Sequence, residues 1–262
     1  MKVPSLVFAI GIVGSISGAS ANSAINLHAN APNFDCGLFY RMHSLPQTDP
    51  LDNVLKKLDA ASASFRAVEA DFEWDQYEKV INEVDDVQKG VIHYRRTGKE
   101  KDIEMKIDVK TEGDSENTQK PQPKFVLLSG GKLSVYWPPK RDQIKVIDLG
   151  QNASDFQSYL AIGFGSSGQD LLKAFDVTYS GPETISGVAT AQLKLVPKSE
   201  RIRSNFKEII LWIDLDRGIS VQQKFTNPQG DSKLVKYSSI RMKDKLDDDI
   251  FKLKTTDKTQ RL

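Results

Sequence analysis

The chain has 262 residues, with 36 Lys and Arg against 35 Asp and Glu, and 39% of its residues are hydrophobic. This length and composition are typical of a large globular domain with a sizeable buried core. The near balance of charge argues against a global attraction to nucleic acid or anionic lipid.

The first 21 residues are expected to be a secretory signal peptide. Lys2 precedes an apolar stretch over residues 6–16, and residues 19–21 have the small side chains of a cleavage site. The alternative, a membrane anchor, is disfavoured because a spanning helix needs roughly 20 apolar residues. Cleavage would remove a single charged residue and leave a neutral, exported protein.

Residues 22–49 are predicted to be a linker or disordered arm, since they contain Pro32, Pro46 and several Asn without any periodicity. They also contain the single cysteine, Cys36, which cannot form an internal disulfide. No small residues precede Cys36 as a lipid-attachment signal requires. We expect one folded domain over residues 50–255 and a tail over residues 256–262.

An amphipathic helix is predicted at the start of the domain, because Asp49 suits a helix cap and Pro50 suits a first turn. Apolar residues then recur at helical spacing: Leu51, Val54, Leu55, Leu58, Ala61 and Phe65. Two short helices are predicted over residues 154–162 and 169–175. The stretch 163–168 between them matches G-x-G-x-x-G, but a dinucleotide site needs a preceding parallel strand, so a glycine-rich connector is favoured.

Strict alternation of apolar and polar residues predicts strands at residues 70–74, 103–109, 133–137 and 209–213. Turn signals separate the strands at residues 121–123, 130–131, 138–139, 216–218 and 227–230. The predicted fold class is mainly β (α+β), with an antiparallel sandwich or barrel.

No catalytic or metal-binding motif is found in the sequence. His28, His43 and His93 have no partners at metal-ligand spacing, and neither a G-x-S-x-G elbow nor an H-E-x-x-H helix occurs. The acidic runs 85–86 and 247–249 lack the spacing of a calcium loop. We therefore expect no catalytic residues, no metal and no cofactor. A hydrolase whose site is assembled only by the fold stays an open alternative.

The order of these elements resembles the periplasmic outer-membrane lipoprotein carrier (LolA-like) family over about residues 50–255. The resemblance rests on the helix leading into the strand at 65–74, and on Gly90 followed six residues later by Arg96. It also rests on the strand-turn-strand at 125–136, the turn at 227–230 and Phe251. The chain departs from the family at Thr97, where proline is usual, and in an added polar loop at 111–117.

The resemblance implies a curved, incompletely closed antiparallel β-barrel, with the N-terminal helix and the two short helices acting as a lid. It implies a monomeric, soluble periplasmic carrier, a chaperone of outer-membrane biogenesis that shields the acyl chains of lipoproteins or related lipids. An inner-membrane transporter would release this cargo to the carrier, and an outer-membrane receptor would accept it. The alternative is a lipid-responsive periplasmic sensor that acts through a protein partner.

The alternating apolar residues are candidates for the lipid-binding wall, although the same pattern also makes a packed core: Phe72, Trp74, Met105, Ile107, Leu133, Trp137 and Leu211. By the resemblance, Arg96 would tie the mouth of the barrel to the lid, and the alternative is an ordinary solvated arginine. Further residues are weaker candidates for the lid: Leu160, Ile162, Phe164, Leu171, Leu172 and Phe175.

Overall fold

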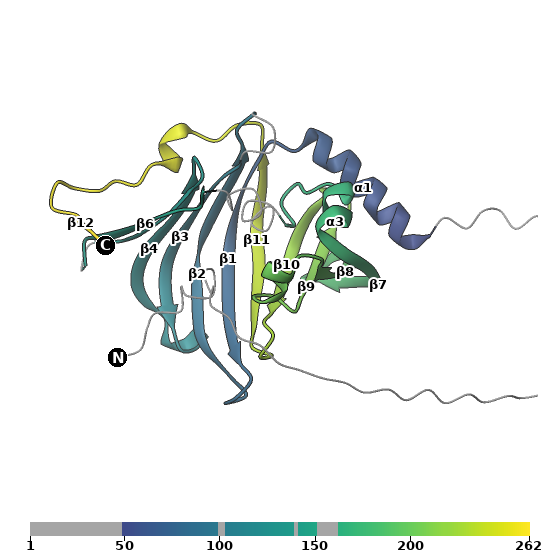
Figure 1. Cartoon of the computed structure of the whole chain (residues 1–262), viewed down its shortest axis with the longest axis horizontal. Helices are drawn as coiled ribbons and strands as arrows, with labels where there is room; N and C mark the ends of the chain where they lie inside the picture. The colour runs from purple at the N-terminus through teal and green to yellow at the C-terminus, as the bar shows by residue number, and fades with distance from the viewer. Residues whose placement is uncertain (1–48, 99–102, 139–140, 151–161) are drawn as a thin grey trace, which may run out of the picture. The chain divides into compact units, whose positions relative to one another are not determined.

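The computed structural model describes residues 49–98, 103–138, 141–150 and 162–262, all within the compact unit Asp49–Leu262 (Figure 1). The predicted signal peptide, nearly all of the predicted linker, and the helix predicted at 154–162 apart from Ile162 lie outside the described residues.

Helix α1 (Pro50–Ser64) begins where the capping residues predict. The Asp49 carboxylate accepts a hydrogen bond from the backbone N–H of Leu51 at 2.9 Å, and this bond satisfies one of the free amides at the helix start. The apolar stripe buries Val54, Leu55 and Leu58. The helix ends before Phe65, whose extended backbone leads into the first strand.

One twelve-stranded sheet contains all the strands of the described residues, in the order β12-β6-β5-β4-β3-β2-β1-β11-β10-β9-β8-β7. Their bounds are β1 (Ala67–Glu78), β2 (Glu83–Arg96), β3 (Ile103–Gly113), β4 (Lys120–Ser129), β5 (Lys132–Trp137), β6 (Gln143–Asp148), β7 (Phe175–Ile185), β8 (Val188–Pro197), β9 (Glu208–Asp214), β10 (Ile219–Thr226), β11 (Ser232–Lys243) and β12 (Gln260–Arg261).

The sheet consists of two antiparallel meanders, β1–β6 and β7–β11, joined by the antiparallel pairing of β1 with β11. Only β12 runs parallel to its neighbour, β6. The edges, β12 and β7, are not paired with each other, so the sheet is not closed. This arrangement confirms the predicted half-barrel of antiparallel strands with helices.

Four short helical segments complete the described elements: η2 (Glu116–Thr118), α3 (Gly168–Ala174), α4 (Glu200–Arg203) and η4 (Asp248–Phe251). Helix α3 confirms the helix predicted at 169–175, except that Phe175 already begins β7. None of the helices in the described part of the chain is long and apolar enough to cross a bilayer.

The turn predicted at residues 121–123 is wrong, because β4 runs through it from Lys120. The pairing of β4 with β5 starts only at Phe125, so the preceding residues have no partner on that side. On the other side the register with β3 shifts between Val109 and Thr111. Proline is tolerated at such a strand edge or bulge, because no backbone hydrogen bond of the sheet there requires the N–H that proline lacks.

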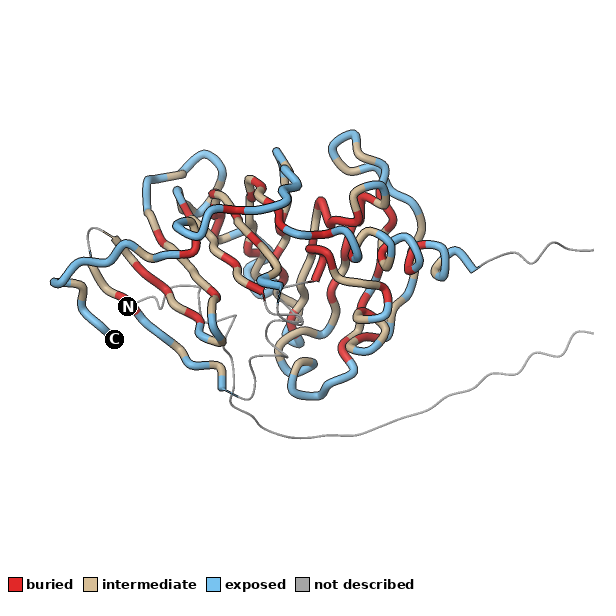
Figure 2. The backbone as a smooth tube through the Cα atoms, turned by 90° about the horizontal axis from the view of Figure 1, so that it is seen from above, coloured by how far each residue is buried: buried red, intermediate tan, exposed pale blue. Residues whose placement is uncertain are grey.

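The strand register places most of the buried apolar residues of both meanders on one face of the sheet, here called the inner face. Trp74 lies opposite Val235 of β11, Val235 opposite Gln223 of β10, and Gln223 opposite Leu211 of β9. Opposed residues in a sheet point to the same side. Figure 2 shows the resulting alternation of buried and less buried residues along the strands.

Two clusters of buried apolar residues cover the inner face. The first cluster draws mainly on β1–β5 and includes Phe72, Tyr94 and Met105. The second cluster draws on β7–β9 together with α1 and α3, through residues such as Leu58 and Leu171. The described helices α1 and α3 therefore pack on the β7–β9 side of the sheet (Figure 1).

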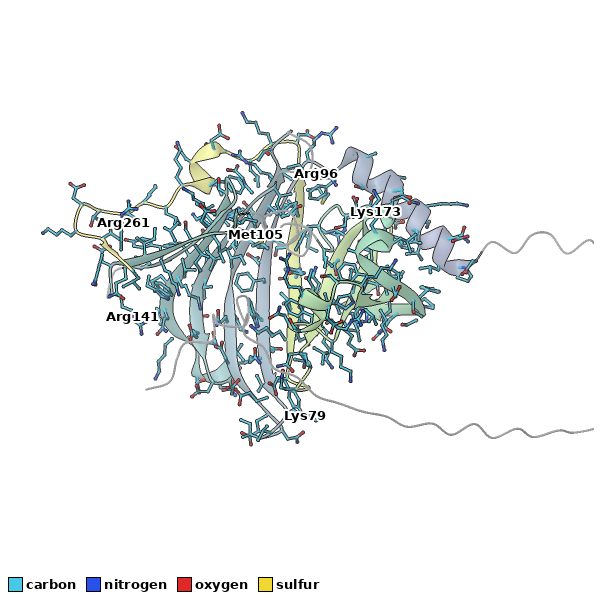
Figure 3. The ribbon with its side chains drawn as sticks, viewed as in Figure 1. Lys79, Arg96, Met105, Arg141, Lys173 and Arg261 are labelled. Atoms are coloured by element: carbon cyan, nitrogen blue, oxygen red, sulfur yellow. The ribbon has the colours of Figure 1, made fainter. Side chains whose placement is uncertain are left out.

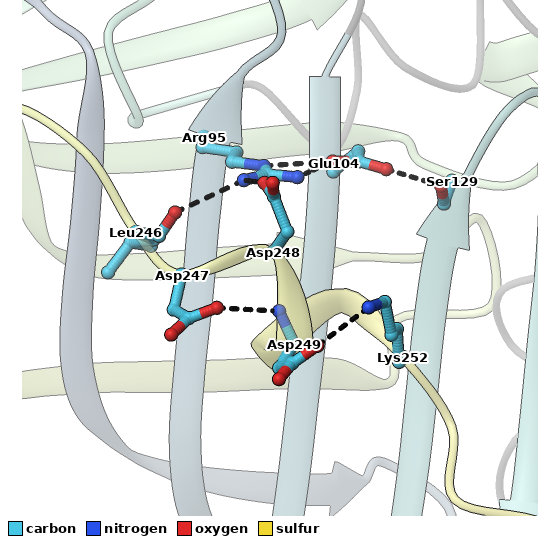
Figure 4. A network of polar contacts seen from close by, with 8 residues as sticks. All are labelled: Arg95, Glu104, Ser129, Leu246, Asp247, Asp248, Asp249 and Lys252. Atoms are coloured by element: carbon cyan, nitrogen blue, oxygen red, sulfur yellow. Dashed lines mark hydrogen bonds and ion pairs between the residues drawn. The ribbon is translucent and has the colours of Figure 1, made fainter.

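The segment after β11 packs on the opposite, outer face around Arg95 (Figure 4). Arg95 donates hydrogen bonds to one oxygen of Glu104 at 2.6 and 2.8 Å, and its Nη1 donates to Asp248 at 2.5 Å. Its guanidinium also lies 4.2 Å from the centre of the Phe251 ring. This network fastens η4 to the outer face.

We expect Arg95→Met to lower the free energy of unfolding by about 3 kcal/mol, because the largely buried Glu104 carboxylate would lose its cation. The control is Asp248→Asn, since Asp248 is exposed and its loss should change stability little. Urea denaturation at pH 7 measures both values. Equal losses in the two variants would contradict a stabilising role for the Arg95–Glu104 pair.

Candidate functional site

The glycine-rich stretch 163–168 lies tightly against α1 and the inner face. A Cβ on Gly165 would come 2.5 Å from the Phe65 ring, and one on Gly168 would come 2.7 Å from the backbone oxygen of Leu55. Gly163 accepts a backbone hydrogen bond from Ser220 of β10 at 2.8 Å. The glycines of the G-x-G-x-x-G match therefore allow the chain to pack closely against Phe65 and α1 where α3 begins. No strand immediately precedes the match within the described residues.

Arg96 joins β2 to this stretch and to α1 (Figure 3). Its Nη1 donates to the backbone oxygen of Ser62 at 2.7 Å, and its Nη2 donates to the Ser62 hydroxyl at 2.9 Å and to the backbone oxygen of Gly165 at 2.5 Å. The guanidinium also lies 5.5 Å from the centre of the Phe65 ring. The planar fork of an arginine suits several acceptors at once. These contacts hold three chain segments together.

Four aromatic residues extend the contacts around Arg96 onto the inner face. Phe164 stacks on Tyr94 at 5.7 Å between ring centres and meets Tyr237 edge-on at 4.9 Å, while Phe65 lies 5.7 Å from Tyr94. Burial raises the pKa of Tyr94 and of Tyr237 well above the usual tyrosine range. Both phenols therefore stay neutral at physiological pH.

The proposed wall residues divide into two groups by burial. Four are buried and packed in the clusters of the inner face: Phe72, Met105, Leu133 and Leu211. Trp74 and Ile107 are partly buried beside the first cluster, and Trp137 is also partly buried. Leu211 lies in the cluster to which α1 and α3 contribute.

The proposed lid residues lie mostly within the second cluster. Ile162, Leu171 and Phe175 are buried there, whereas Phe164 belongs to the first cluster. Leu172 is partly buried, and Leu160 lies outside the described residues. The described lid candidates thus contact both halves of the inner face.

A buried polar group at the other end of the inner face was not predicted from the sequence. We call it the polar corner and define it by Gln76, Asp86, Gln88, Lys124 and Lys233, each of which is at most 8% exposed. The signal was present, because Gln76 follows Phe72 and Trp74 in the same alternating phase. A polar residue in an apolar phase marks either the end of a core or a buried polar site.

Burial dominates the electrostatics of the polar corner. It lowers the pKa of the Lys233 amine to about 7, against a weaker stabilising effect of Asp86. It also raises the pKa of Asp86, with Glu112 acting in the same direction. A charged lysine without water is costly, and proximity to Trp74, whose ring centre lies 4.5 Å from the amine, offsets part of that cost.

No set of three or more His, Cys, Asp or Glu side chains suited to a metal ion occurs among the described residues. His93 lies on the outer face, where Glu69 is 3.2 Å and Asp108 is 4.0 Å away. Burial lowers the pKa of His93 despite these two carboxylates.

We expect the stability of the protein to depend on pH through Lys233. Between about pH 7 and pH 10 the unfolded chain would hold the Lys233 proton while the folded chain releases it, so the free energy of unfolding should rise with pH. Relative to Lys233→Met, the wild type should gain about 1–2 kcal/mol from pH 7 to pH 9. Urea denaturation of both proteins measures the difference, and parallel pH profiles would contradict the prediction.

No family model matches the chain, and no curated protein matches it. Among solved structures, an uncharacterised conserved protein from Thermus thermophilus is similar over 80% of this chain and 97% of its own, with 8% identity and a TM-score of 0.48. MucB is similar over 78% of this chain, with 12% identity and a TM-score of 0.46, and this chain spans only 62% of MucB.

A LolA superfamily protein from Nitrosomonas europaea is similar over 78% of this chain and 97% of its own, with 12% identity and a TM-score of 0.35. These likenesses concern the fold only.

Proposed function

We propose that this protein is a soluble periplasmic carrier that shields the acyl chains of lipoproteins or related lipids on the inner face of its sheet. It would receive its cargo from an inner-membrane transporter and deliver it to an outer-membrane acceptor. The observation that carries the proposal is the band of partly exposed apolar residues beside the first cluster, which includes Trp74, Ile107, Val126 and Ile147. These partly exposed side chains offer apolar contact to a ligand and contain no reactive group.

The energetics of transfer explain why a carrier needs such a surface. Each exposed methylene costs about 0.8 kcal/mol in water, so two or three long chains cost on the order of 20–40 kcal/mol. Non-covalent affinity saturates at about 20 kcal/mol. A carrier must therefore cover the chains broadly and release them directly to an acceptor. A wide apolar sheet face with few polar anchors meets both needs.

Arg96 is proposed to control access to this face. Its three hydrogen bonds fix the relation of β2, α1 and the 163–168 stretch, and breaking them would favour a state in which α3 moves away from the sheet. Bonds donated by a charged group each contribute about 1.5–3 kcal/mol, which is enough to change the populations of two states severalfold.

We expect the purified protein to bind lipid and Ile107→Glu to bind at least about ten-fold less, because a carboxylate would be placed among the partly buried apolar residues beside the first cluster. The matched control is Val146→Glu, since Val146 is 42% exposed and points to the outer face of β6 beside β5. Native mass spectrometry with lipid extraction measures occupancy. A wild-type protein that stays empty when offered acylated lipoprotein or phospholipid would refute the carrier function.

We expect Arg96→Lys to weaken the hydrogen-exchange protection of α3, measured at the amide of Leu171, by about ten-fold. Lysine keeps the charge but cannot reach all three acceptors. The control is Arg66→Lys, because the Arg66 guanidinium donates to the nearby carbonyls of Ala63 and Phe65, which belong to its own end of α1 and not to α3. Unchanged protection in Arg96→Lys would show that Arg96 does not hold α3 in place.

A further inference from the structure

Exposed apolar side chains gather at the turn between β1 and β2. Six large apolar residues are exposed in the described part of the chain, and three of them, Val80, Ile81 and Val84, lie within five consecutive positions. Val80 is 94% exposed and Ile81 is 51% exposed. Single exposed apolar residues are ordinary on a protein surface, whereas a group of neighbours marks a contact site. We call residues 78–85 the hairpin tip.

Contacts with neighbouring residues hold the hairpin tip in one conformation. The Tyr77 hydroxyl donates to the side-chain oxygen of Asn82 at 2.7 Å, and Asn82 has a φ of 58°, which asparagine tolerates better than most residues. The backbone N–H of Lys79 donates to the Asp231 carboxylate at 3.0 Å, so the start of β11 braces the turn. An ordered tip loses little conformational freedom when it binds, which favours contact through its exposed side chains.

The hairpin tip lies at the far end of β1 and β2 from Arg96. Figure 3 labels Lys79 at one end of the sheet and Arg96 at the other, and in Figure 1 the turn projects beyond the ends of the neighbouring strands. Between these ends β1 runs for 12 residues, which corresponds to roughly 35 Å of extended chain. A partner bound to the tip would therefore leave free the end at which Arg96 bonds to α1.

Acidic side chains accompany the apolar ones. Glu78, Glu83 and Asp85 belong to the tip and Asp231 lies beside it, while Lys79 is the one basic residue in the sequence 78–85. An anionic membrane surface would repel this charge. Two copies of the chain that met tip to tip would also bring like charges together. A protein surface with an apolar recess and a basic border is complementary to both features of the tip.

We propose that the hairpin tip is a docking site for a protein partner that presents an apolar recess bordered by Lys or Arg side chains. Val80 and Ile81 enter the recess, and the exposed Glu83 faces the basic border. This contact goes beyond the lipid-carrying function, because it assigns a protein interaction to a surface apart from the inner face.

The test replaces Val80 by the photo-cross-linking residue benzoylphenylalanine in the full chain, in the cell envelope that naturally contains it. We expect a cross-linked protein whose attached segment, identified by peptide mass spectrometry, contains Lys or Arg beside apolar residues. The control is the same replacement at Val146, which is 42% exposed on the outer face of β6. The yield at Val80 should be at least about five-fold that at Val146. Equal yields, or an attached segment without basic residues, would overturn the proposal.

The other possible occupants give different cross-linked products. A product that contains phospholipid would identify a membrane surface, and a product of twice the mass of the chain would identify a second copy. Either of these as the main product would overturn the proposal.

Substitutions test the two features of the tip separately. With the cross-linker at position 80, Ile81→Ser and Glu83→Lys should each lower the yield of the protein product at least about five-fold, the first by removing apolar contact and the second by reversing a charge. The control is Glu200→Lys, a charge reversal at an 85% exposed side chain in α4. An unchanged yield in either tip variant would overturn the proposal.

Lipid binding distinguishes this docking site from the carrier function. Neither Ile81 nor Glu83 belongs to the apolar clusters of the inner face, so Ile81→Ser and Glu83→Lys should retain the lipid occupancy of the wild type in native mass spectrometry. Loss of lipid together with loss of cross-linking would overturn a separate docking site. A wild type that binds no lipid but still gives the cross-linked protein would refute the carrier function alone.

Discussion

The antiparallel pairing of β1 with β11 is the contact on which the rest of the structure depends. It joins two meanders that would otherwise be separate sheets, and it brings Glu69 to Arg241, residues separated by 172 positions. Ion pairs on the outer face reinforce it, as between Glu73 and Lys236 at 2.8 Å. The same pairing places Gln76 beside Lys233, so the continuous apolar face and its polar end have one origin.

Local sequence patterns were sufficient for much of the fold. The start of α1 followed from its cap and its proline, and the strands around Phe72, Met105 and Leu211 followed from alternation. The turn predicted at 121–123 failed because proline also fits a strand edge, and whether a segment is an edge depends on neighbours that local sequence does not reveal. The pairing of β1 with β11 joins strands far apart in the sequence, so the periodicity of either strand alone could not predict it.

The candidate site shows the same division. Apolar wall residues were identifiable by phase, but the pattern could not separate packed positions such as Leu211 from partly exposed ones such as Trp137. The polar corner was missed because Gln76, Asp86 and Lys233 come from three strands, and each alone is typical of a solvated position. Only the family resemblance distinguished Arg96 from Arg95 in the sequence, because the two side chains are chemically identical. In the structure Arg95 points to the outer face, whereas Arg96 bonds to Ser62 of α1.

Residues 256–262 have a consequence for the behaviour of the protein at high concentration. Gln260 and Arg261 pair with β6, and the Asp142 carboxylate accepts hydrogen bonds from the hydroxyls of Thr256 and Thr259. This pairing covers the start of a strand that would otherwise offer free backbone groups, next to the exposed Val146. Unprotected strand edges are templates for self-association. The charged tail therefore covers part of this sheet edge, and we expect it to reduce self-association of the protein there.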